Sequence, residues 1–195
     1  MVIAFLGVDG SGKSTIINSL KDLNLPFCKF YYFHLKPRVI RLNKKNDAVT
    51  NPHSKAEYNG TISYIKLVHF IMTYWLGFLI NFLPFTEKNS LIIFDRYYDD
   101  IYIDPKRFRY GGSVDFAKFM KLFIPKPDIT FVLTTSPEII IKRKQEISFK
   151  ELIRQIGEYQ KIKGKNIIQI DVNASIEEIS QQVQKIIFEK LSDKY

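Results

Sequence analysis

The 195-residue sequence predicts an α/β fold in which a five-stranded parallel sheet is flanked by helices, giving three layers. Short apolar runs alternate with helical patterns along the chain, as they do in repeated βαβ units. A glycine-rich segment at residues 7–14 joins an apolar run to an amphipathic one. Hydrophobic residues make up 46% of the chain, which suits the core of one domain spanning residues 1–195.

The predicted strands are apolar runs at residues 2–8, 28–33, 90–95, 128–134 and 166–170. Helices are predicted at residues 13–23, 64–83, 116–122 and 149–162, with two more beginning near Pro137 and Ser175. Proline suits a first helical turn because its missing N–H is not needed there. Ser175 and Glu178 form a capping box, which predicts the start of the last helix. Residues 36–61 are polar, and we expect them to be irregular.

The glycine-rich segment has the spacing of a phosphate-binding loop. Residues 7–14 read Gly-Val-Asp-Gly-Ser-Gly-Lys-Ser, between a predicted strand and a predicted helix. The glycines let several backbone N–H groups face one centre, and the helix N-terminus adds partial positive charge. Lys13 can reach the β- and γ-phosphates, and the Ser14 hydroxyl can ligate Mg²⁺. The segment predicts a P-loop NTPase fold with an ATP site formed by Gly7, Asp9, Gly10, Ser11, Gly12, Lys13, Ser14 and Thr15.

The third predicted strand ends in Asp95 and Arg96. Strand C-termini face the ligand crevice in a parallel sheet, so we expect Asp95 near the Mg²⁺ together with Ser14. Hydrolysing ATPases usually carry a glutamate after this aspartate, whereas an arginine cannot act as a base but can clamp a phosphate. The pair therefore favours phosphate transfer to a bound acceptor over hydrolysis. A GTPase is disfavoured, because residues 43–47 have the wrong spacing and place for a guanine-reading motif.

At this point the sequence resembles the thymidylate kinase family over nearly its whole length. The resemblance rests on residues 7–15, on Phe-Asp-Arg-Tyr at 94–97, on Lys-Pro-Asp-Ile-Thr at 126–130 with Ser-Pro-Glu at 136–138, and on Ile-Asp at 170–171. It implies an ATP-dependent phosphotransferase acting on a nucleoside monophosphate, with dTMP giving dTDP as the first expectation.

The resemblance also implies roles for individual residues. Asp9 would lie between donor and acceptor, and Arg96 would hold the acceptor phosphate. Arg143 would begin a lid over the ATP at about residues 142–155, and residues 171–174 would run past the adenine. The implied catalytic set is Asp9, Lys13, Asp95, Arg96 and Arg143. Such enzymes are often dimers through the long helix, so the resemblance implies a homodimer through residues 64–83.

The predicted acceptor site departs from the family. A serine and a thymine-reading Tyr-Gln pair are usual after Asp-Arg-Tyr, but residues 99–112 contain no glutamine, and Phe-His-Leu-Lys-Pro-Arg at 33–38 replaces the Arg-Glu-Pro-Gly-Gly segment. Two alternatives stay open: a kinase for a sugar or glycan-precursor hydroxyl, with Asp9, Asp99 or Asp100 as base, and a nucleotide-binding protein without kinase activity. The candidate acceptor contacts are Asp9, Arg96, Tyr97, Asp99, Lys106, Arg107 and Arg109.

Net charge, cysteine content and hydropathy limit which ligands and which cellular setting we expect for this protein. The formal net charge is +9, but the basic residues are spread along the chain, which favours small phosphorylated ligands over nucleic acid. Cys28 is the single cysteine and the first residues lack the features of a signal peptide, so we expect a reduced, cytoplasmic setting. Residues 62–85 are apolar but contain Lys66, His69 and Asn81, which favours a buried or interface helix over a membrane span. A peripheral membrane contact is the alternative.

Overall fold

The computed structural model describes residues 1–37, 56–79, 90–143 and 147–193. Its sheet has five parallel strands in the order β2-β3-β1-β4-β5. The strands are β1 Val2–Leu6, β2 Lys29–His34, β3 Ser90–Asp95, β4 Ile129–Thr134 and β5 Ile167–Asp171. The predicted five-stranded parallel α/β fold is confirmed.

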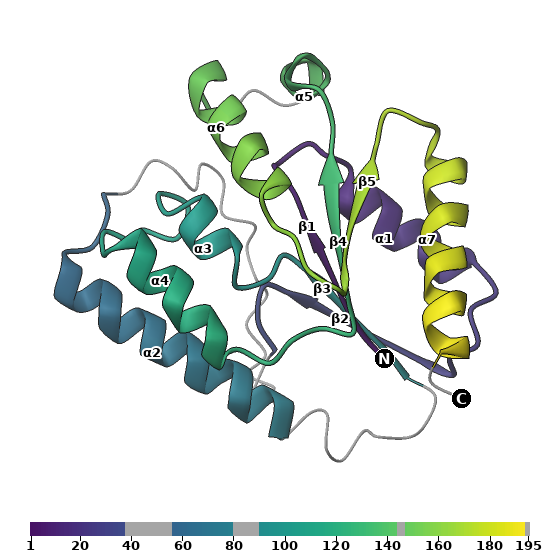
Figure 1. The fold of residues 1–195 in the computed structure, drawn as a ribbon, viewed down its shortest axis with the longest axis horizontal. Coiled ribbons are helices and arrows are strands. Elements are labelled where there is room, and N and C mark those ends of the chain that lie inside the picture. The colour runs from purple at the N-terminus through teal and green to yellow at the C-terminus, as the bar shows by residue number, and fades with distance from the viewer. Residues whose placement is uncertain (38–55, 80–89, 144–146, 194–195) are drawn as a thin grey trace.

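Helices cover both faces of the sheet (Figure 1). On one face, α1 (Lys13–Asp22) packs against α7 (Ile176–Ser192). The other side carries α2 (Gly60–Gly77), the single turn α3 (Asp100–Ile103), α4 (Val114–Met120) with the 3₁₀ turn Lys121–Phe123, and α6 (Phe149–Gln160). The short helix α5 (Pro137–Arg143) follows β4 beyond the end of the sheet.

The central strand β1 supplies side chains to both layers of the core, because alternate residues of a strand point to opposite faces. Ile3 and Phe5 pack with α1 and α7, where Phe5 stacks on Phe131 at 5.1 Å between ring centroids. Ala4 and Leu6 belong to the cluster on the other face. Because both faces are buried, the phosphate loop that follows β1 starts from a fixed strand.

The long apolar helix differs most from its predicted bounds. It begins at Gly60 rather than residue 64, because the Asn59 side chain caps it by accepting a hydrogen bond from the Ile62 N–H at 3.0 Å. The helix extends to Gly77. Residues 80–89, where the predicted end falls, lie outside the described residues, as do 38–55 of the predicted irregular stretch. Within the described part of the chain, no helix combines the length and apolarity needed to cross a bilayer.

Candidate active site

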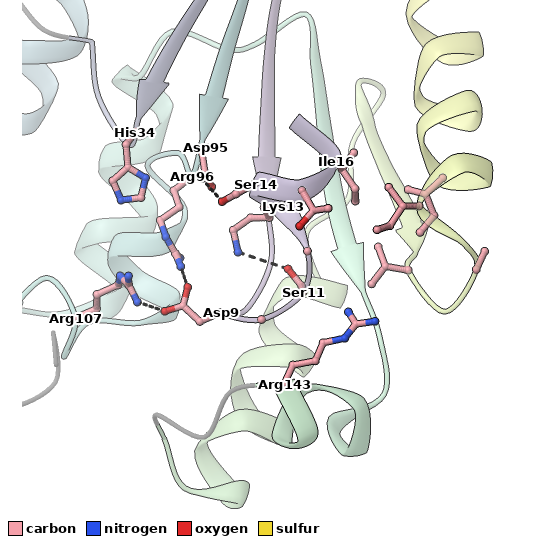
Figure 2. Close-up of a pocket in the computed structure, with 17 residues that line it drawn as sticks. Asp9, Ser11, Lys13, Ser14, Ile16, His34, Asp95, Arg96, Arg107 and Arg143 are labelled. Carbon is pink, nitrogen blue, oxygen red and sulfur yellow. Dashed lines mark hydrogen bonds and ion pairs between the residues drawn. The ribbon is translucent and has the colours of Figure 1, made fainter. Parts of the chain in front are cut away.

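A cavity of about 630 Å³ lies at the carboxyl ends of the strands, around the phosphate loop (Figure 2). The loop forms its floor, the ends of β2 and β3 approach from one side, and α5 and the start of α7 from the other. Its polar and charged lining includes Asp9, Ser11, Lys13, Ser14, Thr15, His34, Asp95, Arg96, Arg107 and Arg143.

The phosphate loop has a backbone that glycine makes possible. Gly7, Gly10 and Gly12 all have positive φ angles, of 146°, 86° and 87°. A Cβ at Gly7 would also meet the backbone oxygen of Leu133 at 2.9 Å, so space as well as conformation requires glycine there. These positions let the loop curl around the end of α1 as the sequence predicts.

Lys13 lies buried at the centre of this curl. Its ammonium group donates to the backbone oxygens of Gly7 and Val8, each at 2.8 Å. Burial lowers the pKa of Lys13 to about 8, with Arg96 adding to the effect and the nearby carboxylates opposing it. An ammonium held in a ring of backbone dipoles is poised to meet the β- and γ-phosphates of a nucleotide.

Asp95 ends β3 beside the phosphate loop. Its Oδ2 accepts hydrogen bonds from the Ser14 hydroxyl at 3.1 Å and from the Tyr32 hydroxyl at 3.0 Å. Its Oδ1 is buried and has no hydrogen-bond partner among the described residues. A buried carboxylate oxygen without a partner is costly, and a divalent cation with oxygen ligands would satisfy it. Ser14 and Asp95 therefore fit the Mg²⁺ site that the sequence predicts.

Asp9 carries two guanidinium groups at the entrance to the cavity (Figure 2). Arg96 bonds to its Oδ1 and Arg107 to its Oδ2. Burial by itself would raise the pKa of Asp9, but Arg96, Lys13 and Arg107 together hold it well below its usual range. Asp9 is thus ionised and binds the guanidinium groups of Arg96 and Arg107, which are far from it in the sequence.

Arg96 is held in a conformation that arginine seldom adopts. Its φ is +79°, and its backbone N–H donates to the Phe5 oxygen at 3.0 Å, continuing the pairing of β3 with β1 by one residue. Only 3% of the residue is exposed. The turn therefore directs a buried guanidinium back toward the phosphate loop instead of out along the strand.

Arg143 reaches the cavity from the other side. It is the last residue of α5 and is exposed, and Figure 2 shows it across the loop from Arg96 and Arg107. Four apolar residues of the lining, from the end of β5 and the start of α7, lie on that side as well: Val172, Ala174, Ile176 and Ile179. The cavity thus has an apolar side with one arginine and a polar side with two.

The structure does not bring all predicted acceptor contacts together. Tyr97 donates to the Pro125 oxygen at 2.5 Å, and Asp99 pairs with Lys121, and both line a separate cavity of about 390 Å³. Arg109 bonds to the Ala56 oxygen at 2.8 Å. The left-handed turn at Arg96 leads the chain toward α3, and Tyr97 and Asp99, which precede that turn of helix, face the separate cavity.

Lys106 is exposed and does not belong to the lining of the active-site cavity. Of the predicted acceptor contacts, Asp9, Arg96 and Arg107 line this cavity.

Two residues near the end of β2 also belong to the site: His34, which the sequence offers as a possible acceptor contact, and Tyr32, which the motifs did not identify. Tyr32 bonds to Asp95, and His34 lines the cavity. The strand register accounts for both positions, because His34 pairs with Asp95 across β2 and β3. The signal in the sequence was that β2 ends in a polar residue, His34, and that its neighbour β3 ends in an acidic residue, Asp95.

Comparisons with known proteins identify the family of this chain. A family model described as thymidylate kinase matches residues 5–183. The chain belongs to the thymidylate kinase family. The family resemblance drawn from the motifs is thereby confirmed, and the protein is a P-loop kinase.

Several thymidylate kinases align with this chain along nearly their whole length. The probable thymidylate kinase 1 of Saccharolobus solfataricus is 27% identical over 212 residues, which cover 97% of this chain and 98% of that protein. The thymidylate kinase of Trichodesmium erythraeum is also 27% identical, over 217 residues that cover 97% and 95%.

Two solved structures share the fold. The thymidylate kinase of Candida albicans has a TM-score of 0.64 at 21% identity, covering 96% of this chain and 91% of its own. A deoxyadenosine kinase from M. mycoides with bound dATP has a TM-score of 0.58 at 17% identity, covering 96% and 99%.

Proposed function

We propose that this protein transfers the γ-phosphate of ATP to a nucleoside monophosphate, with dTMP giving dTDP as the leading reaction. The observation that carries the proposal is the pair of guanidinium groups on Asp9, one from Arg96 and one from Arg107. Two cations that converge beside a phosphate loop suit an acceptor that is itself an anion. A neutral sugar hydroxyl would offer these two guanidinium groups no negative charge to bind.

The residues divide the reaction between them. Lys13 meets the β- and γ-phosphates, and Arg143 lies where it can neutralise charge on the transferring group. Ser14 and Asp95 would hold Mg²⁺, which neutralises phosphate charge when bound. Arg96 and Arg107 exchange Asp9 for the acceptor phosphate and orient it for in-line attack. An acceptor phosphate is already nucleophilic, so no general base is needed.

The choice of dTMP is supported by the relatives. Those reported above are named thymidylate kinases, and two of them match nearly all of this chain. The deoxyadenosine kinase contributes fold similarity alone, because only 17% of its aligned residues are identical. The relatives and the arginine pair together favour a nucleoside monophosphate over a sugar.

The test measures ADP release with dTMP, thymidine and neutral sugars as acceptors, in the parent protein and in Arg107→Ala. Loss of a charge-assisted hydrogen bond of about 1.5–3 kcal/mol should raise the KM for dTMP by about 10- to 100-fold, with the KM for ATP nearly unchanged. Lys106→Ala is the matched control, because it removes a neighbouring exposed cation that does not line the cavity. Turnover of thymidine or a sugar in preference to dTMP, with Arg107→Ala unaffected, would overturn the proposal.

We also propose a homodimer through α2, extended by α4 and the 3₁₀ turn. Large apolar side chains are exposed along these three elements, including Ile65 at 65%, Met72 at 57% and Leu122 at 69%. Contiguous apolar surface of this kind marks an interaction site. A second copy fits best, because α2 is the helix that the predicted interface at residues 64–83 uses.

The remaining assignments are also proposals. The single exposed cysteine, Cys28, suits a reduced cytoplasmic setting. The lid predicted at residues 142–155 would comprise the end of α5 with Arg143 and the start of α6, and its residues 144–146 lie outside the described part of the chain. One continuous sheet supports a single domain over residues 1–195.

A further inference from the structure

A buried chain of polar groups runs from α6 to the acceptor arginine. The Tyr159 hydroxyl, on α6, donates to Oδ1 of Asp100, the first residue of α3. The same oxygen lies 3.6 Å from Nη1 of Arg96, and Nη2 of Arg96 bonds to Asp9. Asp100 is 0% exposed and Tyr159 is 1% exposed. The arginine thus has two carboxylate partners, one in the cavity lining and one behind it.

Asp100 cannot serve as the base that the sequence leaves open for it. It is fully buried and is not part of the cavity lining, so an acceptor hydroxyl does not reach it. Both of its oxygens are also used inside the protein, since Oδ2 accepts from the Tyr97 N–H at 3.3 Å. These contacts tie Asp100 to the turn that bears Arg96.

A buried carboxylate is unfavourable unless it is paired. Burial raises the pKa of Asp100 to about 6, while Arg96 and the Tyr159 hydroxyl oppose the increase. Burying the Asp100 carboxylate therefore lowers the stability of the fold. The groups that it contacts are the backbone turn at Arg96, with a φ of +79°, and the Arg96 guanidinium, which must release Asp9 to receive an acceptor. After that exchange, Asp100 still holds the other nitrogen of Arg96 in place.

Resting on the proposed function, we propose that Asp100 and Tyr159 are positioning residues for the acceptor phosphate. They fix the guanidinium of Arg96 from behind, and they tie it to α6. That helix packs against α5, which carries Arg143 on the donor side. The donor-side and acceptor-side arginines are thereby held through one packed unit rather than through independent loops.

Kinetics of Asp100→Asn and Tyr159→Phe test this assignment. Tyr159→Phe should raise the KM for dTMP by about 3- to 10-fold and Asp100→Asn by about 10- to 100-fold, with the KM for ATP changed less than about twofold, because loss of a neutral hydrogen-bond partner costs less than loss of a charge. Tyr98→Phe is the control, since Tyr98 is as buried and donates to the Ala117 oxygen at 2.9 Å, away from Arg96. A lower melting temperature in all three variants with equal dTMP kinetics would overturn the proposal.

A second measurement does not depend on the acceptor's identity. Rotation of the Arg96 guanidinium is followed by NMR of ¹⁵N-labelled arginine side chains, with the signal assigned by its loss in Arg96→Lys. We expect slow rotation in the parent protein and in Tyr98→Phe, and faster rotation in Tyr159→Phe and Asp100→Asn. Unchanged rotation in these two variants would overturn the positioning role. Absence of dTMP turnover in the parent protein would instead count against the proposed function alone.

Discussion

Lys13 is deeply buried, and its pKa lies close to the pH of ordinary assay buffers. Burial lowers its pKa to about 8, so a large share of the free protein carries a neutral amine at pH 8. Bound phosphates favour the ammonium form and must raise this pKa.

ATP binding should therefore take up about half a proton at pH 8 and much less at pH 7, where the amine is already protonated. Calorimetry of Mg–ATP binding in buffers of different ionisation enthalpy measures this uptake. Lys13→Arg is the control, because its guanidinium stays protonated and no comparable uptake should occur. Equal uptake at the two pH values would contradict the assignment of Lys13 to the phosphates.

Asp95 offers one carboxylate oxygen to the protein and keeps the other unpaired among the described residues. In Asp95→Asn, we expect the Mg²⁺ concentration for half-maximal activity to rise by about 10- to 100-fold, because a neutral amide is a weaker ligand for a hard cation.

A Mg²⁺ titration of the kinase rate provides the measurement. Tyr32→Phe is the matched variant, since it removes a hydrogen bond to Oδ2 and leaves Oδ1 as it is. A larger effect from Tyr32→Phe than from Asp95→Asn would show that the carboxylate orients other groups and does not ligate the cation.

At the scale of the element, α7 connects its capping to the active site. The Ser175 hydroxyl accepts from the Glu178 N–H at 3.2 Å, and the Glu178 carboxylate accepts from the Ser175 N–H at 3.0 Å. The first turn that this box fixes contributes Ile176 and Ile179 to the cavity lining. The cap thus stabilises the helix and positions two residues on the apolar side of the cavity.

Ser175→Ala should lower the free energy of unfolding by about 1 kcal/mol, since it leaves an N-terminal N–H without its partner. Urea unfolding monitored by circular dichroism measures the change. Ser192→Ala, at the other end of the same helix, should change stability by less than about 0.5 kcal/mol. Equal effects at the two ends would exclude a specific role for the capping box.

How well the sequence predicts each helix or strand depends on the burial and the length of that element. β3 was predicted with its observed bounds because all six of its residues are buried, and its four central apolar residues stand between Ser90 and Asp95, the polar residues that begin and end the strand. The turn α3 was missed because its four residues, Asp-Ile-Tyr-Ile, are all buried and are too few to show a helical period. The start of α2 was missed because its cap, Asn59, precedes an apolar pattern that was read only from residue 64.

The site was predictable where its residues are neighbours in sequence. Gly7, Lys13 and Ser14 belong to one loop whose spacing determines its geometry. The pairing of Asp9 with Arg107 joins residues 98 positions apart, and only the path of the chain through α3 brings them together. Tyr97 and Asp99 line the separate cavity, and the sequence did not indicate this because the positive φ of Arg96 cannot be read from an arginine in the sequence.

At the scale of the whole molecule, the exposed apolar surface of α2 and the 3₁₀ turn predicts self-association. Light scattering at micromolar concentration should give the mass of a dimer. Ile65→Asp and Leu122→Asp should each shift the protein toward the monomer, because they introduce a charge into apolar surface that a partner would bury.

Phe188→Asp is the control, since Phe188 is exposed on α7, on the opposite side of the sheet. A monomeric parent protein, or equal loss of dimer in all three variants, would contradict an interface at α2. Flotation with lipid vesicles by the parent protein, lost in Ile65→Asp, would instead identify the surface as a membrane contact.

The strand order places most of the segments that depart from the family on one side of the sheet and most of those that resemble it on the other. β1 lies in the middle, with β3 and β2 on one side and β4 and β5 on the other. The segments that depart from the family, residues 33–38 and 99–112, begin at the end of β2 and after β3. The segments that resemble it at 126–138 and 170–171 belong to the β4 and β5 side, and on the other side the resemblance is confined to residues 94–97 at the end of β3. Evolution can therefore exchange the acceptor-binding connections while the ATP-binding half is kept, and grafting those two connections between relatives should carry acceptor preference with them.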